Sequence, residues 1–270
     1  MPPTPSKRWN KYLIAGLSMT GLAVLLAILG FFWTPYAPSA MSAAERFHAP
    51  SLRHLFGTDN FGRDIFSRVM QGMGTTVLIS ILVVLFSAAL GILLGAVTGY
   101  FGGILDEVVM RFTDAVNGFP SILLALVVIS ILGNGRQNLI LSLGIVFTPS
   151  YVRIVRSEYL RLRDADYIKR ARLMGVGRLR ILFVHILPNI LPVFWVSVMI
   201  GLNNAILAES GMSYLGIGVQ PPEASLGNML SDAQGYLQSA PWYALAPGLS
   251  IVWLVLGFSL FSEGIRRRGE

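Results

Sequence analysis

The sequence predicts an all-α membrane protein that crosses the bilayer six times. Apolar residues make up 54% of the 270-residue chain and charged residues only 13%, about half the charged share of a typical globular domain. The mean hydropathy is +0.63. Six stretches are long enough to cross a hydrocarbon core of about 30 Å, because a helix rises about 1.5 Å per residue. They run from Leu13 to Trp33, Thr76 to Tyr100, Val108 to Leu132, Leu139 to Val155, Leu187 to Leu215 and Trp242 to Phe261.

The first stretch is expected to be a retained span rather than a secretory signal. Basic residues precede it, as in a signal peptide, but its apolar run of about 20 residues exceeds the length of a signal core. It ends in Phe31, Phe32 and Trp33, which suit a membrane interface, and no small-residue cleavage pattern follows. We therefore expect a cytoplasmic N-terminus and first span over 1–33, followed by an extracytoplasmic loop over 34–70.

The second stretch is uncharged and carries glycines at four-residue intervals. Gly91, Gly95 and Gly99 share one helix face. Small residues at this spacing let two membrane helices approach closely. The sequence thus predicts a tight helix contact along the inner half of the second span.

Acidic residues occur in two of the remaining spans, where an unpaired charge is costly. Glu107, Arg111 and Asp114 fall on one helix face at the start of the third span. They either neutralise one another or line a translocation path. Glu209 lies near the outer end of the fifth span without a nearby cation in sequence. It either lines the path or pairs across helices.

The distribution of basic residues predicts the orientation. With the N-terminus in the cytoplasm, sixteen of the 21 Lys and Arg residues fall on the cytoplasmic side and five on the other. Cytoplasmic loops carry this excess. Both termini are expected in the cytoplasm, and the net charge of +7 is a topology signal that requires no nucleic-acid partner.

The basic inner segment between the fourth and fifth spans predicts a short amphipathic helix. Asp166 is expected to cap it, Tyr167 to Met174 to form about two turns, and Gly175 to end it in the left-handed conformation. The same residues also suit a loop that lies on anionic lipid. The residues alone leave both interpretations open.

Enzyme and metal-site interpretations are excluded by what the chain lacks. It has no cysteine, and its three histidines, His48, His54 and His185, have no i, i+4 pairing typical of a zinc site. The glycine spacing around Gly57 and Gly62 lacks the lysine of a phosphate-binding loop. No catalytic residue, metal site or nucleotide site is therefore predicted, and any energy for transport must come from a gradient or from a partner.

Four separated motifs resemble one family. The inner segment combines Asp166-Tyr167, Ala171 and Gly175 with a later Ile-Leu-Pro-Asn at 186–189. This is similar to the cytoplasmic signature loop of ABC importer permeases. The other three motifs resemble the second (C-type) permease of peptide and nickel importers. They are the run 55–68, the set Tyr100 to Gly103 with Asp106, Met110, Arg111, Asp114, Phe119 and Pro120, and Glu209 with the run 212–222.

The resemblance covers almost the whole chain and implies an architecture and partners. It implies the type I importer permease fold, paired as a heterodimer with a homologous permease in the bacterial inner membrane. Two ATPase subunits would bind ATP and Mg²⁺, leaving this chain without a cofactor, and an extracytoplasmic protein would deliver small peptides, nickel or a nickel chelate. Lys169 and Arg170 depart from the usual Glu-Ala of the loop, and Leu226 stands where tryptophan is common. The alternative function is a gradient-driven carrier or channel.

Three sets of residues follow as candidate sites. The ATPase-coupling residues would be Asp166, Tyr167, Ile168, Lys169, Arg170, Ala171, Arg172, Leu173, Met174 and Gly175, with Ile168, Leu173 and Met174 as apolar anchors. The binding-protein docking residues would be Gly57, Asp59, Gly62, Arg63 and Asp64, and the path residues Glu209, Arg111 and Asp114. The core permease domain is expected over 74–263, with the coupling segment at 156–185 and a cytoplasmic tail at 264–270.

Overall fold

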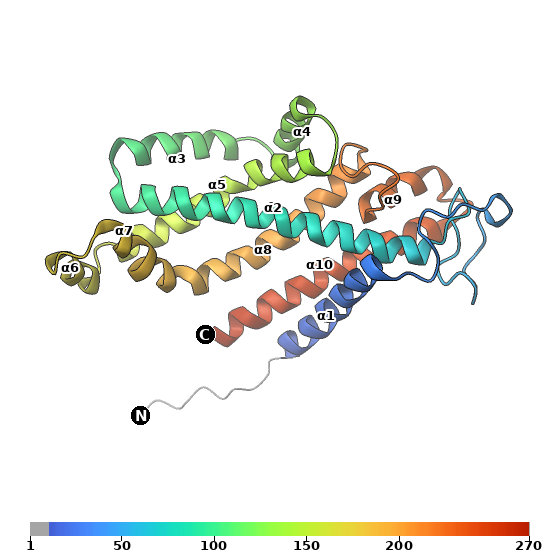
Figure 1. The fold of residues 1–270 in the computed structure, drawn as a ribbon, viewed down its shortest axis with the longest axis horizontal. Helices are drawn as coiled ribbons and strands as arrows, with labels where there is room; N and C mark the ends of the chain where they lie inside the picture. The colour runs from blue at the N-terminus through green and yellow to red at the C-terminus, as the bar shows by residue number, and fades with distance from the viewer. Residues whose placement is uncertain (1–10, 270) are drawn as a thin grey trace. The chain divides into compact units, whose positions relative to one another are not determined.

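The computed structural model describes residues 11–269, which are almost entirely helical (Figure 1). Residues 1–10 of the predicted cytoplasmic N-terminus, and residue 270, lie outside it. The helices are α1 (Lys11–Phe32), α2 (Ile65–Phe101), α3 (Gly103–Asn117), α4 (Ser121–Leu132), α5 (Arg136–Leu162), α6 (Asp166–Leu173), α7 (Arg178–Arg180), α8 (Leu187–Tyr214), α9 (Leu226–Ala233) and α10 (Pro241–Gly269). Single helical turns occur at Ala43–Glu45 and Gln234–Tyr236, and a π-helical turn, Ile181–Ile186, joins α7 to α8. Most residues of each predicted span therefore lie in a helix.

Five of the described helices are long and apolar enough to cross a membrane singly. They are α1, α2, α5, the continuous helix Arg178–Tyr214 and α10. The expectation of one continuous third span over 108–132 is wrong, because α3 and α4 meet at a bend of 99°. Pro120 explains the break, since the residue before a proline is disfavoured in the α conformation. The predicted six spans are reached only if this bent pair counts as one.

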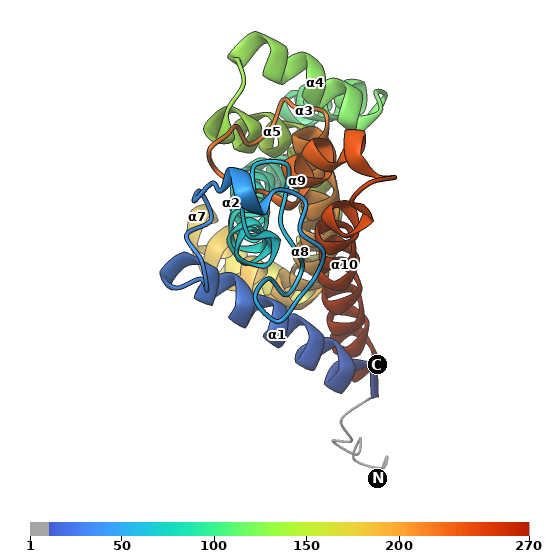
Figure 2. The same ribbon diagram turned by 90° about the vertical axis from the view of Figure 1, so that its right-hand side faces the viewer.

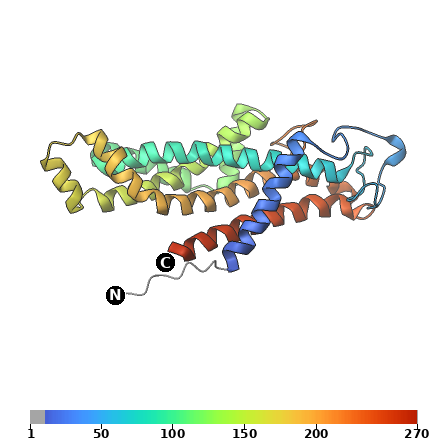
Figure 3. The same ribbon diagram turned by 60° about the horizontal axis from the view of Figure 1, so that its bottom comes forward.

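The chain forms two compact units, one of residues 1–77 with 221–270 and one of 78–220. In the first, α1 crosses α10 (Figure 3). A Cβ on Gly16 would lie 2.2 Å from the backbone nitrogen of Phe261, so the two helices touch backbone to backbone. The indole N–H of Trp253 also donates to the carbonyl of Met19 at 3.0 Å.

In the second unit, the predicted glycine contact is confirmed along α2 and α5. The pairs are Gly91 with Tyr151, Gly95 with Val155 and Gly99 with Tyr159. A Cβ on the first glycine would lie 2.3 Å from the Cβ of its partner, and on the other two 2.7 Å. No side chain fits at these separations, so α5 packs directly against the α2 backbone.

Candidate functional site

The cytoplasmic segment folds as a short helix with a firm C-terminal cap. Gly175 has φ +77°, as predicted. The backbone N–H of Val176 donates to the carbonyl of Ala171, and that of Gly175 to the carbonyl of Arg172, both at 3.0 Å. These two bonds form a Schellman motif, which satisfies carbonyls that the end of a helix would otherwise leave open.

The start of α6 differs from the prediction. Ala165 occupies the capping position, and Asp166 is the first helical residue, without a side-chain capping bond. The carboxylate of Asp166 instead lies 3.8 Å from the ammonium of Lys169. A negative charge in the first turn still interacts favourably with the helix dipole. The expected capping role of Asp166 is wrong, and the helix begins one residue before the predicted start at Tyr167.

The two faces of α6 have different surroundings. Ile168 and Ala171 are buried in the chain itself. Ile168 was expected to be an apolar anchor for a partner, and this expectation is wrong, because its side chain instead holds the helix in place. Tyr167, Leu173 and Met174 are 42%, 88% and 77% exposed. Apolar side chains this exposed on a capped helix are suited to a partner contact.

The basic residues of α6 also fall into two groups, those that are exposed and one that contacts another helix of the chain. Lys169 and Arg170 are exposed. The guanidinium of Arg172 instead lies 5.1 Å from the centre of the Tyr100 ring, at the end of α2, a cation–π distance. Of the basic residues expected to meet a partner, Arg172 is therefore engaged with its own chain.

The outer loop folds around two tight turns. Gly57 and Gly62 both have positive φ, +74° and +73°. A Cβ on Gly62 would overlap the carbonyl of Ser42, and one on Gly57 would lie 2.5 Å from the carbonyl of His48. These glycines close the loop on itself, so the expected tight turns are present.

The charged residues predicted to dock the binding protein are inside this loop. Asp59 is fully buried and accepts from the backbone N–H of Phe61 and Arg63 and from the Arg63 guanidinium at 2.5 Å. Asp64 accepts from Ser67 and lies 2.8 Å from His54 Nδ1. The expectation that Asp59, Arg63 and Asp64 contact a partner directly is therefore wrong, because the loop uses them as its own core.

The loop lies beside α9 (Figure 2), and its polar network extends to α9 and to the start of α10. Arg63 lies 3.7 Å from Asp232 of α9, and the Tyr243 hydroxyl donates to the Asn60 amide oxygen at 3.3 Å. Burial raises the pKa of Asp232, which the nearby Arg68 and Arg63 only partly offset. The loop is thus joined to α9 through Arg63 and to α10 through Asn60.

Apolar side chains project from the loop beside the exposed Arg46 and Arg53. Leu52 is completely exposed, and Met41, Leu55 and Phe61 are largely so. The sequence contains a signal for this surface, because bulky apolar residues are unexpected in a polar connector.

The three predicted path residues lie in three different settings. Arg111 pairs with Glu107 at 2.6 Å on the exposed face of α3. Asp114 instead binds Arg153 of α5 at 2.5 Å, so it joins two helices rather than completing the cluster on one. Glu209 is fully buried and accepts from the Ser213 hydroxyl at 2.8 Å. Its side chain is therefore enclosed by the described part of the chain.

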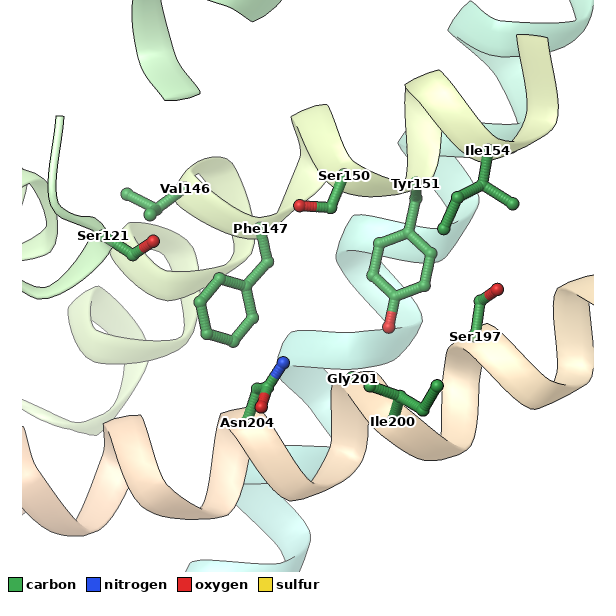
Figure 4. Close-up of a pocket in the computed structure, with 10 residues that line it drawn as sticks. All are labelled: Ser121, Val146, Phe147, Ser150, Tyr151, Ile154, Ser197, Ile200, Gly201 and Asn204. Carbon is green, nitrogen blue, oxygen red and sulfur yellow. The ribbon is translucent and has the colours of Figure 1, made fainter. Parts of the chain in front are cut away.

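A cavity of about 210 Å³ lies between α4, α5 and α8, where no site was predicted (Figure 4). Its polar lining comes from Ser121, Ser150, Tyr151, Ser197 and Asn204. The signal in the sequence is the presence of polar residues within long apolar runs. Among residues 11–269, no three His, Asp or Glu side chains gather as a metal site.

Residues 91–268 match the family of the binding-protein-dependent transport system inner membrane component. The chain belongs to this family. The permease is 38% identical to the dipeptide transport system permease protein DppC of Alkalihalophilus pseudofirmus, over 95% of this chain and 84% of that protein. It is 36% identical to DppC of Haemophilus influenzae, over 98% and 94%, and 35% identical to the di/tripeptide permease DppC of Pseudomonas aeruginosa, over 98% and 91%.

The fold of the permease is also found among solved structures. An inward-facing structure of the MetNI methionine ABC transporter matches with a TM-score of 0.61 and 21% identity, over 75% of this chain and 96% of that one. The expected all-α, type I importer permease fold is confirmed. The chain is a multi-pass inner-membrane subunit of an ABC importer, which works with a partner permease and with separate ATPase subunits that hydrolyse ATP. This assignment replaces the alternative of a gradient-driven carrier or channel.

Proposed function

We propose that this permease imports small peptides and forms half of their path through the inner membrane. A homologous, non-identical permease forms the other half, and an extracytoplasmic binding protein delivers the peptide. The names of relatives matched over nearly the whole chain, which specify dipeptide or di/tripeptide transport, support peptides over nickel or a nickel chelate.

Two ATPase subunits supply the motion, one of them through α6. The observation that supports this proposal is the structure of α6. Its inner face is fixed by the buried Ile168 and Ala171, its end is closed by the cap at Gly175, and its outer face presents Leu173 and Met174. A helix held in this way moves as one piece with the membrane helices. Such a contact transmits force, whereas a loop resting on lipid requires no firm cap.

In the proposed orientation, α6 and both termini lie in the cytoplasm. The excess of Lys and Arg on that side supports this direction. ATP and Mg²⁺ bind to the ATPase subunits, and this chain takes no cofactor of its own. The outer loop, with exposed Leu52 and Phe61, then faces the binding protein.

Uptake by the complete complex in proteoliposomes tests the substrate class. We expect ATP-dependent accumulation of a labelled dipeptide when the binding protein is present, and no accumulation of free Ni²⁺. Accumulation of nickel without any dipeptide would overturn the proposed substrate and leave the family assignment in place.

A further inference from the structure

The cavity between α4, α5 and α8 lies at the middle of the spans. Its lining residues occupy positions 146–154 of α5, which runs over Arg136–Leu162, and 197–204 of α8, which runs over Leu187–Tyr214. Both stretches are close to the centre of their helices. In a membrane, this places the cavity near the middle of the hydrocarbon core.

The lining combines apolar side chains with hydroxyl and amide groups and carries no charge. Ser150 and Asn204 are exposed on this chain and border the cavity. Amide and hydroxyl groups facing lipid at this depth would be costly, since hydrocarbon offers no hydrogen bond. This face of the permease therefore meets protein or a water-filled path.

Tyr151 gives the cavity a specific hydrogen-bonding group. Its side chain extends from α5 toward α8 (Figure 4), and its hydroxyl is buried without a hydrogen-bond partner among residues 11–269. Gly201 provides the room, because a Cβ there would lie 1.8 Å from that hydroxyl oxygen. Buried polar groups usually have partners, so an unsatisfied one beside a cavity marks a place for a ligand.

We propose that this cavity contacts the backbone of the peptide in transit, with the Tyr151 hydroxyl and the Asn204 amide as its hydrogen-bonding groups. This rests on the proposed import of peptides. Hydroxyl and amide groups each donate and accept, which matches the N–H and C=O that all peptides share. Since no lining residue is charged, the contact does not select for the charge of peptide side chains. The cavity is smaller than a typical ligand pocket, so the partner permease completes it.

Cysteine protection tests the contact directly. The chain contains no cysteine, so the variant Asn204→Cys introduces one thiol into this subunit. In the assembled complex, a water-soluble methanethiosulfonate reagent should modify Asn204→Cys and reduce dipeptide uptake. A transported dipeptide should slow that modification. The matched control is Leu207→Cys, one turn along α8, exposed but outside the cavity lining. It should show neither the loss of uptake nor the protection.

Tyr151→Phe supplies a second variant that removes only the hydroxyl. We expect the KM for dipeptide uptake to rise about fivefold, the size of one lost hydrogen bond. Assembly of the complex and the peptide affinity of the isolated binding protein should be unchanged. If the unmodified complex imports dipeptides but Asn204→Cys is not protected, or Tyr151→Phe leaves the KM unchanged, this inference is overturned alone. A complex that imports no dipeptide at all overturns the proposed function as well.

Discussion

Individual residues in this permease often serve the chain's own structure where their chemistry suggested a partner. Arg63 and Asp64 have the charge expected of a docking surface, yet both are buried in the loop that they stabilise. Ile168 has the apolar side chain expected of an anchor for a partner, yet it is fully buried on the inner face of α6. Sequence patterns identified the right segments because residue type and spacing are local. They could not identify which side chains face outward, because burial depends on contacts between distant parts of the chain.

Gly175→Val should uncouple transport from ATP hydrolysis. A β-branched residue at φ +77° is strained by about 1–2 kcal/mol, which would reshape the cap and tilt α6. Nothing lies within 4 Å of a Cβ at this position, so the effect comes from the backbone and not from a clash. We expect an assembled complex that hydrolyses ATP and imports little substrate.

Gly175→Asn is the matched control, because asparagine tolerates the left-handed conformation better than other side chains. It should retain most uptake. Assembly, hydrolysis and uptake measured on the same preparations decide the matter, and normal uptake by Gly175→Val would show that α6 transmits no force.

Arg63→Ala should open the outer loop. It leaves Asp59 buried without its closest cationic partner, and breaking such a pair costs about 3–5 kcal/mol. Limited proteolysis of the loop should accelerate, and stimulation of ATP hydrolysis by the binding protein should fall. Leu52→Asp, on the exposed surface, should weaken the stimulation while the loop stays resistant to protease. A protease-resistant Arg63→Ala loop would contradict the buried-core role.

The helical elements of the permease were predictable where apolar runs were long. The first span was expected to end at Trp33 and ends at Phe32, and the fifth was expected to end at Leu215 and ends at Tyr214. The bend between α3 and α4 was missed, although Gly118 and Pro120 were visible in the sequence. A proline near a span centre is often accommodated, as Pro149 is within α5, so its effect depends on neighbouring helices.

The ion pair between Asp106 and Arg156 should hold α3 against α5. Two hydrogen bonds of 2.5 and 2.6 Å join the carboxylate to the guanidinium in a partly buried setting. Arg156→Asp should destabilise the complex by about 1–2 kcal/mol, between the ranges for exposed and buried pairs. Adding Asp106→Arg should recover part of the thermal stability in detergent. No recovery in the double variant would mean that the two helices are held by other contacts.

At the scale of the whole molecule, the orientation of the permease rests on the sequence and can be tested independently. Cysteines replacing Ser51 and Ser239, both exposed, should react with an impermeant thiol reagent added to spheroplasts. A cysteine replacing Ser6 should react only after the membrane is permeabilised. The chain has no native cysteine, so its own background is absent. Labelling at Ser6→Cys in intact spheroplasts would reverse the proposed topology.

The contact between α2 and α5 at Gly91, Gly95 and Gly99, here called the glycine seam, also determines which positions tolerate substitution. At Gly91, Gly95 and Gly99 even a methyl group collides with a side chain of the facing helix, so we expect almost every mutation there to be selected against. Gly21 and Gly211 have open space around them and no unusual φ, and they are free to vary. In a saturation mutagenesis library selected for uptake, the seam should accept only glycine, while these two positions accept many residues. Glycines within the same chain are thus expected to differ widely in evolutionary constraint, according to the space around each one.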